Sequence, residues 1–398
     1  MINPSVPGWI DKFFAEQNRS SHSFPKDEED FYIRTRNTGF IFGHIVSFDA
    51  SIPIETEDRL PQEISKIGML NTLFQMYRLV RQNNNNTAFV EETVAFYNTM
   101  IPKGFNPLKK VLESSSYSNK LEKIVHERVQ TNEDIFSKNF SHVITNALLF
   151  IDVLAFKQYL EKGNVPEKYS TIIEDIVISI VSLSLKSKTG ISPHDDLLAK
   201  LFESSVRYNK YNNNNINTIE DLDLSYLSNK LEKYYVIDLA GISLWSDAKV
   251  ENEERYFMFK LGEILHTDDN KVLESIHFIN NFIITYKAEI PYFNFSNPVK
   301  HFYDQTTESV AILINRNKSR LLKEISESKE LMQLLAKSTR KDLDKDEKKK
   351  VKKQLLDICK TIPSLTIFLL PGGGLLLPIL IKFIPTLLPS SFNENIDD

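Results

Sequence analysis

The 398-residue sequence has little cysteine and no secretory signal. Its single cysteine, Cys359, excludes an intramolecular disulfide and is compatible with a reducing compartment. The first residues, MINPSVPGWIDKFF, lack a charged start followed by an apolar core, so we expect no signal peptide. The net charge of −5 argues against a general nucleic-acid binder, and we expect no DNA partner.

The sequence also lacks the motifs of familiar enzymes. It contains no phosphate-binding loop, dinucleotide fingerprint or HExxH motif, and Gln130 stands where His126-Glu127 would need a second histidine. Cys359 has no histidine near it in the sequence, which argues against a catalytic thiol. His266 with the following aspartates could bind a metal, but a polar loop between helices is the commoner origin of such a cluster. We expect a non-enzymatic protein without a cofactor.

Apolar residues recur at helical spacing over most of the chain, which predicts a mostly α fold. The hydrophobic content of 41% and charged content of 25% are those of a globular protein with room for two or three domains. The segment Phe40–Val46 fits either a short strand or a buried loop. Helices of the body are predicted at residues 62–82, 89–100, 121–130, 142–160, 170–185, 195–208, 231–244, 251–265 and 270–289.

Changes in composition divide the chain into four predicted regions. These are a mixed and helical region at 1–117, a helical region at 118–290, long amphipathic and basic helices at 291–360, and an apolar segment with a short tail at 361–398. No proline or glycine interrupts Val299–Ser338, which predicts one helix of roughly 60 Å. We expect it to pack on the body, with a coiled coil or an RNA-facing surface as the alternatives.

Two stretches within the helical region form a weak repeat with a spacing of 59 residues. They are Val177–Leu185 and Val236–Leu244. Each predicts an apolar helix that is followed by a short polar turn and an amphipathic helix. The repeat therefore predicts two similar helical units.

A strongly basic helix is predicted just after residue 344. Asp344 and Glu347 have the spacing of a capping box, which marks a helix start. This helix is either a solvated face beside its own acidic residues or a juxtamembrane cluster that holds anionic lipid on the cytoplasmic side. We favour the lipid-facing interpretation because an apolar segment follows. The basic cluster consists of Lys348, Lys349, Lys350, Lys352 and Lys353.

The apolar segment runs from Thr361 to Ile381, 21 residues without a charge, which reaches the length of a membrane-spanning helix. Proline and three glycines break it, so a straight helix is not expected. A kinked spanning helix, a re-entrant hairpin and a buried hairpin of a soluble core all fit. The predicted membrane segment is marked by Ile362, Pro363, Leu370, Pro371, Gly372, Gly373, Gly374, Leu377, Pro378, Lys382, Pro385 and Pro389.

The apolar segment carries a resemblance to a known family. The Leu-Leu-Pro repeats at Leu369–Pro371 and Leu376–Pro378, with Phe383–Pro385, resemble the apolar segment of the LETM family (leucine-zipper–EF-hand-containing transmembrane proteins). The sequence from about Pro291 is also similar to bacterial LETM-related proteins labelled biofilm-associated. The resemblance implies a membrane-linked, non-enzymatic protein with a role in ribosome binding or cation homeostasis. It places the family's ribosome-binding domain after the apolar segment, where Asn393–Asp398 remain.

A second resemblance concerns the helical region. Residues 239–265, LAGISLWSDAKVENEERYFMFKLGEIL, resemble the helical TerB-like (tellurite-resistance) fold. In that fold, acidic residues at the turn and the next helix start can form a metal site, and oxygen ligands suit a hard divalent cation. Helix capping is the simpler explanation, since acidic residues are favoured near a helix N-terminus. The candidate metal ligands are Asp247, Glu251, Glu253 and Glu254.

Three functions fit these observations. The first is a membrane-associated helical adaptor on the cytoplasmic side, with membrane lipids and either the ribosome or another protein as partners. The second is a component of cation transport, which requires a homo-oligomer because one short segment without an intramembrane acid cannot form a conduction path. The third is a soluble metal-sensing TerB-like module whose apolar end is part of its core.

Overall fold

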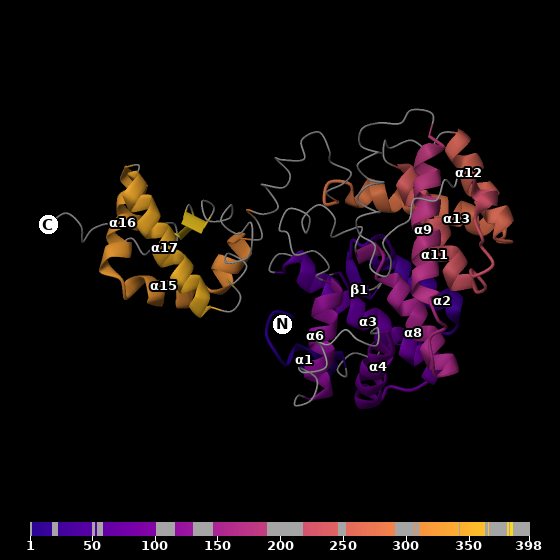
Figure 1. Ribbon diagram of the computed structural model, residues 1–398, viewed down its shortest axis with the longest axis horizontal. Coiled ribbons are helices and arrows are strands. Elements are labelled where there is room, and N and C mark those ends of the chain that lie inside the picture. Colours follow the sequence, from indigo (N-terminus) through magenta and orange to yellow (C-terminus); the bar gives the residue numbers. More distant parts are fainter. Residues whose placement is uncertain are drawn as a thin grey trace. The chain divides into compact units, whose positions relative to one another are not determined.

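The computed structural model describes residues 2–17, 23–49, 52–53, 59–100, 116–129, 146–188, 218–245, 252–290, 307, 310–341, 343–362, 365, 380–381 and 383–384. This part of the chain is mostly α-helical, as predicted. It forms two compact units (Figure 1). The N-terminal unit covers residues 1–295 apart from 57–60 and 132–140, and the C-terminal unit covers those two segments and residues 296–398. Both sides of the boundary predicted at residue 117 fall in the N-terminal unit.

The N-terminal unit is built from packed helices and one short hairpin. α3 packs on α6 and α8, and α11 packs on α9 and α13 (Figure 1). The predicted helices that fall on described residues are confirmed; the one at 195–208 lies outside them. The elements are α1 (Trp9–Gln17), α2 (Glu28–Asn37), η1 (Phe40–Phe42), β1 (Ser47–Asp49), β2 (Ile52–Pro53), α3 (Pro61–Arg81), α4 (Asn86–Met100), α6 (Tyr117–Val129), α8 (Phe150–Lys162), α9 (Tyr169–Lys186), η2 (Ile219–Asp221), α11 (Lys230–Leu244), α12 (Asn252–Ile264) and α13 (Asp269–Tyr286). β1 and β2 pair antiparallel.

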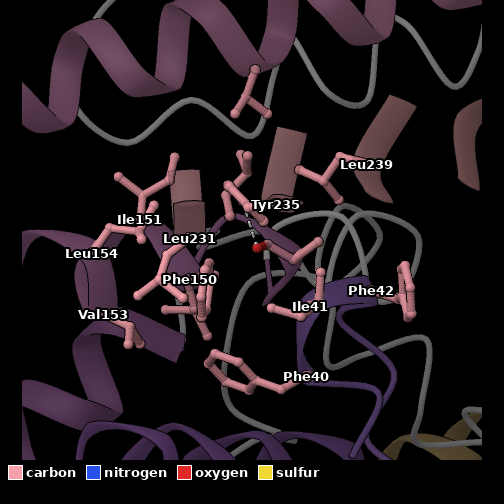
Figure 2. Close-up of a cluster of buried hydrophobic side chains, with 14 of the residues drawn as sticks. Phe40, Ile41, Phe42, Phe150, Ile151, Val153, Leu154, Leu231, Tyr235 and Leu239 are labelled. Carbon is pink, nitrogen blue, oxygen red and sulfur yellow. Dashed lines mark hydrogen bonds between the residues drawn. The ribbon is translucent and has the colours of Figure 1, made fainter. Parts of the chain in front are cut away.

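The core of the N-terminal unit is rich in aromatic side chains. The segment after α2 is a buried turn, η1, rather than a strand, and its three side chains enter the core (Figure 2). Gly39 precedes this turn with a φ of 79°, and a Cβ there would lie 1.9 Å from the carbonyl oxygen of His44. Only glycine fits such a position. Tyr235 crosses the same core and donates a hydrogen bond to the carbonyl of Ala147 at 2.9 Å.

The two repeat stretches predicted from the sequence lie against each other as α9 and α11. The hydroxyls of Ser184 and Ser243, which are 59 residues apart, form a hydrogen bond of 2.5 Å. Towards the start of the helices, Tyr169 donates to Glu232 at 2.5 Å. One contact joins the N-terminal ends of the two helices and the other joins their C-terminal ends, so the helices run parallel.

The C-terminal unit contains a helical segment at 310–316, α15 (Lys318–Ser326), α16 (Lys329–Arg340) and α17 (Lys345–Thr361). The prediction of one uninterrupted helix to Ser338 is therefore wrong. Ser328 lies between α15 and α16 in extended conformation, and its hydroxyl accepts a hydrogen bond from the amide of Leu331 at 3.2 Å. A serine in this role satisfies a free first-turn amide and starts a new helix without any proline or glycine.

The core of the C-terminal unit is aliphatic. Leucine, isoleucine and valine side chains of α15, α16 and α17 fill it, together with Cys359. No described helix of the chain is both long and apolar enough to cross a membrane. Of the predicted membrane segment, Ile362 is described, and it is buried in this core with Leu365, Leu380 and Ile384. The other marked residues, from Pro363 to Pro389, lie outside the described part of the chain.

Candidate functional site

α17 begins at a capping box, as its sequence predicts. The carboxylate of Asp344 accepts hydrogen bonds from the amides of Asp346 at 2.9 Å and Glu347 at 2.8 Å. Glu347 reaches back and accepts from the amide of Asp344 at 3.1 Å. These carboxylates also face the positive end of the helix dipole. The start of α17, and therefore the direction of each side chain that follows, is fixed locally.

One face of α17 is held in the core of the C-terminal unit. Val351, Leu355 and Ile358 are buried there at helical spacing, together with Cys359. Burial raises the pKa of the Cys359 thiol to about 12. At neutral pH the thiol is protonated and has neither the charge nor the exposure of a nucleophile. This side of the helix is structural.

The opposite side of α17 exposes lysines that form no ion pair or hydrogen bond with the described residues, although the charge of Lys353 lies near that of Asp357. Lys350 is different, because it pairs with Glu330 at 2.8 Å, and Lys360 pairs with Asp357 at 2.6 Å. The predicted basic cluster is therefore exposed, but one of its five members is already engaged. We use the term unpaired lysines for the exposed residues that form no ion pair or hydrogen bond within the described part of the chain: Lys345, Lys348, Lys349, Lys352 and Lys353.

The neighbouring helices strengthen the positive charge around α17. From Lys318 to Thr361 the chain has 14 lysines and arginines against 8 acidic residues, a net charge of +6 in a protein whose total is −5. Some of the acidic residues are also neutralised by neighbours: Glu347 by Lys337, and Asp357 chiefly by Lys360, whose hydrogen bond is the main cause of the lowered pKa of that carboxyl. A positive surface of this kind attracts phosphate groups.

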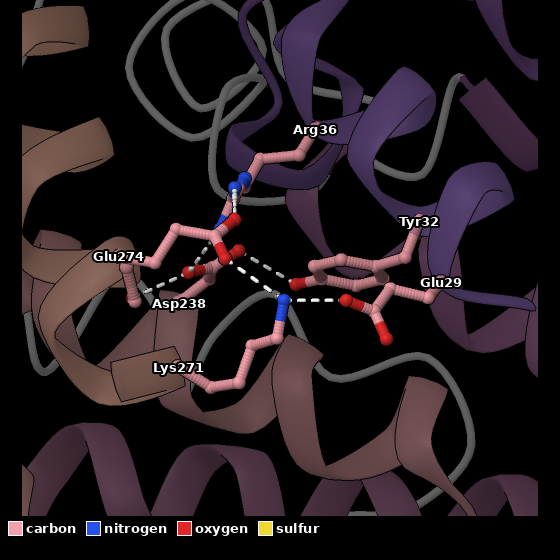
Figure 3. Close-up of polar contacts among 7 residues, drawn as sticks. Glu29, Tyr32, Arg36, Asp238, Lys271 and Glu274 are labelled. Atoms are coloured by element: carbon pink, nitrogen blue, oxygen red, sulfur yellow. Dashed lines mark hydrogen bonds and ion pairs between the residues drawn. The ribbon is translucent and has the colours of Figure 1, made fainter. Parts of the chain in front are cut away.

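A second polar cluster lies inside the N-terminal unit and lines a small pocket (Figure 3). Asp238 on α11 accepts hydrogen bonds from Tyr32 at 2.7 Å and from Ser275. Arg36 lies 3.8 Å from Asp238, bonds to Glu274, and places its guanidinium 4.5 Å from the ring centre of Phe278. Each of these side chains belongs to α2, α11 or α13.

The electrostatics of this cluster indicate a structural tie between three helices. Burial raises the pKa of Asp238, while Arg36 and the hydrogen bonds oppose that shift. Burial, with the Asp238 charge, raises the pKa of Tyr32 well above its ordinary value. Lys271 bonds to both Glu29 and Glu274, which raises the pKa of that lysine. Because each of these charged side chains already has an oppositely charged partner, the cluster holds helices together and offers little to a ligand.

The predicted metal ligands are only partly within the described residues. Asp247 and Glu251 lie outside them, and Glu253 is placed on α12 without a described side chain. Glu254 is buried on α12 with 2% of its surface exposed. Within the described residues, no group of three histidine, cysteine or acidic side chains could hold a metal ion. The four-residue site therefore stays a prediction. In the other candidate cluster, His266 with the two aspartates that follow it, Asp268 caps α13: its carboxylate accepts a hydrogen bond from the amide of Asn270 at 2.7 Å.

The structure shows buried charges that the sequence analysis did not identify. Asp152 is fully buried, and Arg128 binds it through two hydrogen bonds of 2.6 and 2.7 Å, with Tyr97 as a third donor at 2.9 Å. Lys66 is buried next to the Nδ1 atom of His126 at 2.8 Å, and burial lowers its pKa to about 8. The sequence does contain a signal for such buried charges, because Asp152 and Lys66 each interrupt the apolar face of a predicted helix.

Comparison with known families identifies the C-terminus. A family model described as LETM1-like, RBD matches residues 343–398, so this C-terminal segment is similar to a LETM1-like ribosome-binding domain. No curated protein and no solved structure matches the chain. The LETM resemblance is thus confirmed for this region, whereas the TerB-like and biofilm-associated resemblances stay predictions.

The match also corrects the expected position of that domain. The LETM resemblance predicts it after the apolar segment, beyond Phe392, but the match begins at Leu343, one residue before the cap of α17. It includes both the basic helix and the apolar run that follows. The residues matched to this family and the unpaired lysines are therefore in the same part of the chain.

Proposed function

We propose that this protein is a non-catalytic adaptor that binds the ribosome through its C-terminal unit, with the unpaired lysines of α17 as contacting groups. One observation carries the proposal. The residues matched to the ribosome-binding family begin where α17 begins to expose lysines that no described acid neutralises. Much of a ribosome's surface is RNA phosphate, and lysine binds phosphate as a mobile point charge.

The packing of α17 supports this role. Its inner face is anchored by aliphatic side chains and its start by a capping box, so the lysines are presented on a fixed helix. Binding through them breaks no ion pair among the described residues. Lys350 and Lys360, by contrast, would first have to leave Glu330 and Asp357.

A lipid surface is the second candidate partner. The same lysines precede the uncharged run from Thr361 to Ile381, and a basic residue near an anionic membrane contributes about 1 kcal/mol. Against a membrane role, the described members of that run and its surroundings, such as Leu365 and Leu380, are buried in the C-terminal core. The ribosome is therefore the first partner to test.

The test is co-sedimentation of the purified full-length chain with ribosomes. A variant with all five unpaired lysines replaced by glutamine should bind roughly tenfold more weakly or worse, because it loses most of the counterion release that drives binding to phosphates. The control variant loses the same charge from exposed lysines of the N-terminal unit and should bind as the wild type does. The control positions are Lys12, Lys162, Lys168, Lys186 and Lys230.

Equal binding by both variants and the wild type, or equal loss in both variants, contradicts the proposed site. The same three proteins are also mixed with vesicles of phosphatidylcholine and phosphatidylglycerol. If the wild type is retained by these vesicles but not by ribosomes, the lipid surface replaces the ribosome as the partner of α17.

A further inference from the structure

We infer that the component of the ribosome bound by this unit is the phosphate backbone of an RNA double helix. Four of the unpaired lysines carry the contact, and we call them the lysine stripe: Lys345, Lys349, Lys352 and Lys353. The inference rests on the proposed ribosome binding and names the chemical class of the ligand at that site.

The four side chains of the stripe leave α17 on the same side. Successive residues of an α-helix are rotated by about 100°, so the four lysines fall within a sector of about 100°. Val351, Leu355 and Ile358 lie on the other side, in the core. Along the axis the stripe spans about 12 Å, at 1.5 Å per residue. It is a row of cations on one outward face, which can follow a line of phosphates.

The acidic residues of α17 lie beside the stripe. Asp346 and Asp357 flank one of its edges, on the side of Lys350, and Asp357 pairs with Lys360. Glu347 is turned towards Lys337 and the amide of Asp344. The middle of the stripe has lysines and no acidic residue, so its positive charge is available to an anion outside the protein. An RNA backbone supplies that charge in a regular array.

The sequence around the stripe lacks aromatic residues. From Lys318 to Thr361 the sequence has no phenylalanine, tyrosine or tryptophan, and α17 has no arginine. Proteins that bind single-stranded nucleic acid stack the bases on aromatic rings or guanidinium groups. RNA double helices are recognised mostly by shape and by their phosphates and 2′-hydroxyls. A stripe of lysines alone has the chemistry for a duplex backbone and lacks the chemistry for unpaired bases.

The experiment compares two RNA probes by fluorescence anisotropy with the full-length chain. One is a fluorescent RNA hairpin with a continuous duplex stem, and the other is a polyuridine strand with the same number of phosphates. We expect the hairpin to bind at least tenfold more tightly. The logarithm of its association constant should fall with the logarithm of salt concentration with a slope of about −3 to −4, as four phosphate contacts require.

Variants then test the residues of the stripe. Each single substitution, for example Lys349→Gln, should reduce the salt slope by about 1 and weaken binding to any duplex sequence alike. The fourfold glutamine variant should lose duplex binding, while the fourfold arginine variant keeps the charge and should retain it. Protection of the buried Cys359 thiol from labelling shows in each case that α17 is still packed.

The outcomes separate this inference from the proposed function, because ribosome sedimentation is measured with the same proteins. Equal binding of polyuridine and hairpin, or an unchanged slope in the glutamine variants, overturns the inference. If ribosomes sediment with the wild type while neither RNA binds, the ligand is a ribosomal protein and only the proposed function survives. If neither ribosomes nor RNA are bound, both fall together.

Discussion

The two units of this protein place their charges in opposite locations. The N-terminal unit buries charged side chains from most of its helices, such as Asp152, Asp238 and Lys66, within an aromatic core. In the described part of the C-terminal unit, Asn317 is the one buried polar side chain, and the core around it is aliphatic. Its lysines are at the surface, where several have no acidic partner in the described residues.

This difference separates charges that maintain a fold from charges that are available to a partner. A buried charge needs partners that are already in place, so its removal disturbs the unit and its use by a ligand would disturb it too. A surface charge contributes little to stability, so it can be exposed for binding at small cost. We therefore expect substitutions of charge to affect stability in one unit and binding in the other.

The largest expected effect is that of Asp152→Ala. It leaves the guanidinium of Arg128 and the hydroxyl of Tyr97 without their buried acceptor, and should lower the free energy of unfolding by about 3 to 5 kcal/mol. Urea titration followed by tryptophan fluorescence measures this, because both tryptophans, Trp9 and Trp245, are buried in the N-terminal unit. The matched control is Asp357→Ala on α17, which should not change the transition. A loss below about 1 kcal/mol for Asp152→Ala would contradict the statement that the buried charges of the N-terminal unit maintain its fold.

A smaller and pH-dependent effect is expected at Lys66. Its pKa of about 8 in the folded chain lies below the ordinary 10.5, so between these values the folded chain holds fewer protons at this site than the unfolded chain. Stability should therefore rise with pH across this window, by about 3 kcal/mol in total, and the gain is lost progressively as the pH falls from 10.5 to about 8. Lys66→Met should remove the rise, whereas Lys162→Met at an exposed position should keep it.

The measurement for Lys66 is the same fluorescence titration, repeated at several pH values from neutrality to about pH 11. Identical pH profiles for the wild type and Lys66→Met would mean that burial does not lower the pKa of Lys66. The difference between the two profiles is the quantity that counts, because other groups titrate in the same range and cancel in the comparison.

The smallest expected effect on stability is that of the five-lysine glutamine variant. None of the five residues forms an ion pair within the described chain. The free energy of unfolding of the C-terminal unit should therefore stay the same, or rise slightly because repulsion between like charges is removed. The single cysteine reports on this unit alone, since Cys359 is buried in its core. We expect the rate of thiol labelling as a function of urea to match that of the wild type. Faster labelling would show that these lysines support the fold after all.

Local features of the sequence were sufficient to predict where most helices begin and end. The capping box at Asp344 involves residues three apart, and the structure contains it as predicted. The same reasoning missed the break at Ser328, because the prediction considered only proline and glycine as helix breakers. The Ser-Glu-Ser run that ends there offered a capping side chain, which was sufficient to divide one helix into two.

Features that depend on distant residues could not be predicted in the same way. The sequence identified the basic cluster of α17 but not that Lys350 is engaged, since its partner Glu330 lies 20 residues away on α16. Asp238 bonds to Tyr32 across 206 residues. Such pairs follow from packing, and a single sequence indicates only that a charge on an apolar face needs a partner somewhere.

The meeting of Ser184 and Ser243 has a consequence for how the repeat is used. The two hydroxyls occupy equivalent positions of the repeat and bond to each other, so α9 and α11 pack in register. Five residues earlier, the equivalent positions hold Ser179 and Asp238. The second stretch carries there the carboxylate that ties α2, α11 and α13 together, so the two stretches share a packing pattern and differ in the neighbours that they bind.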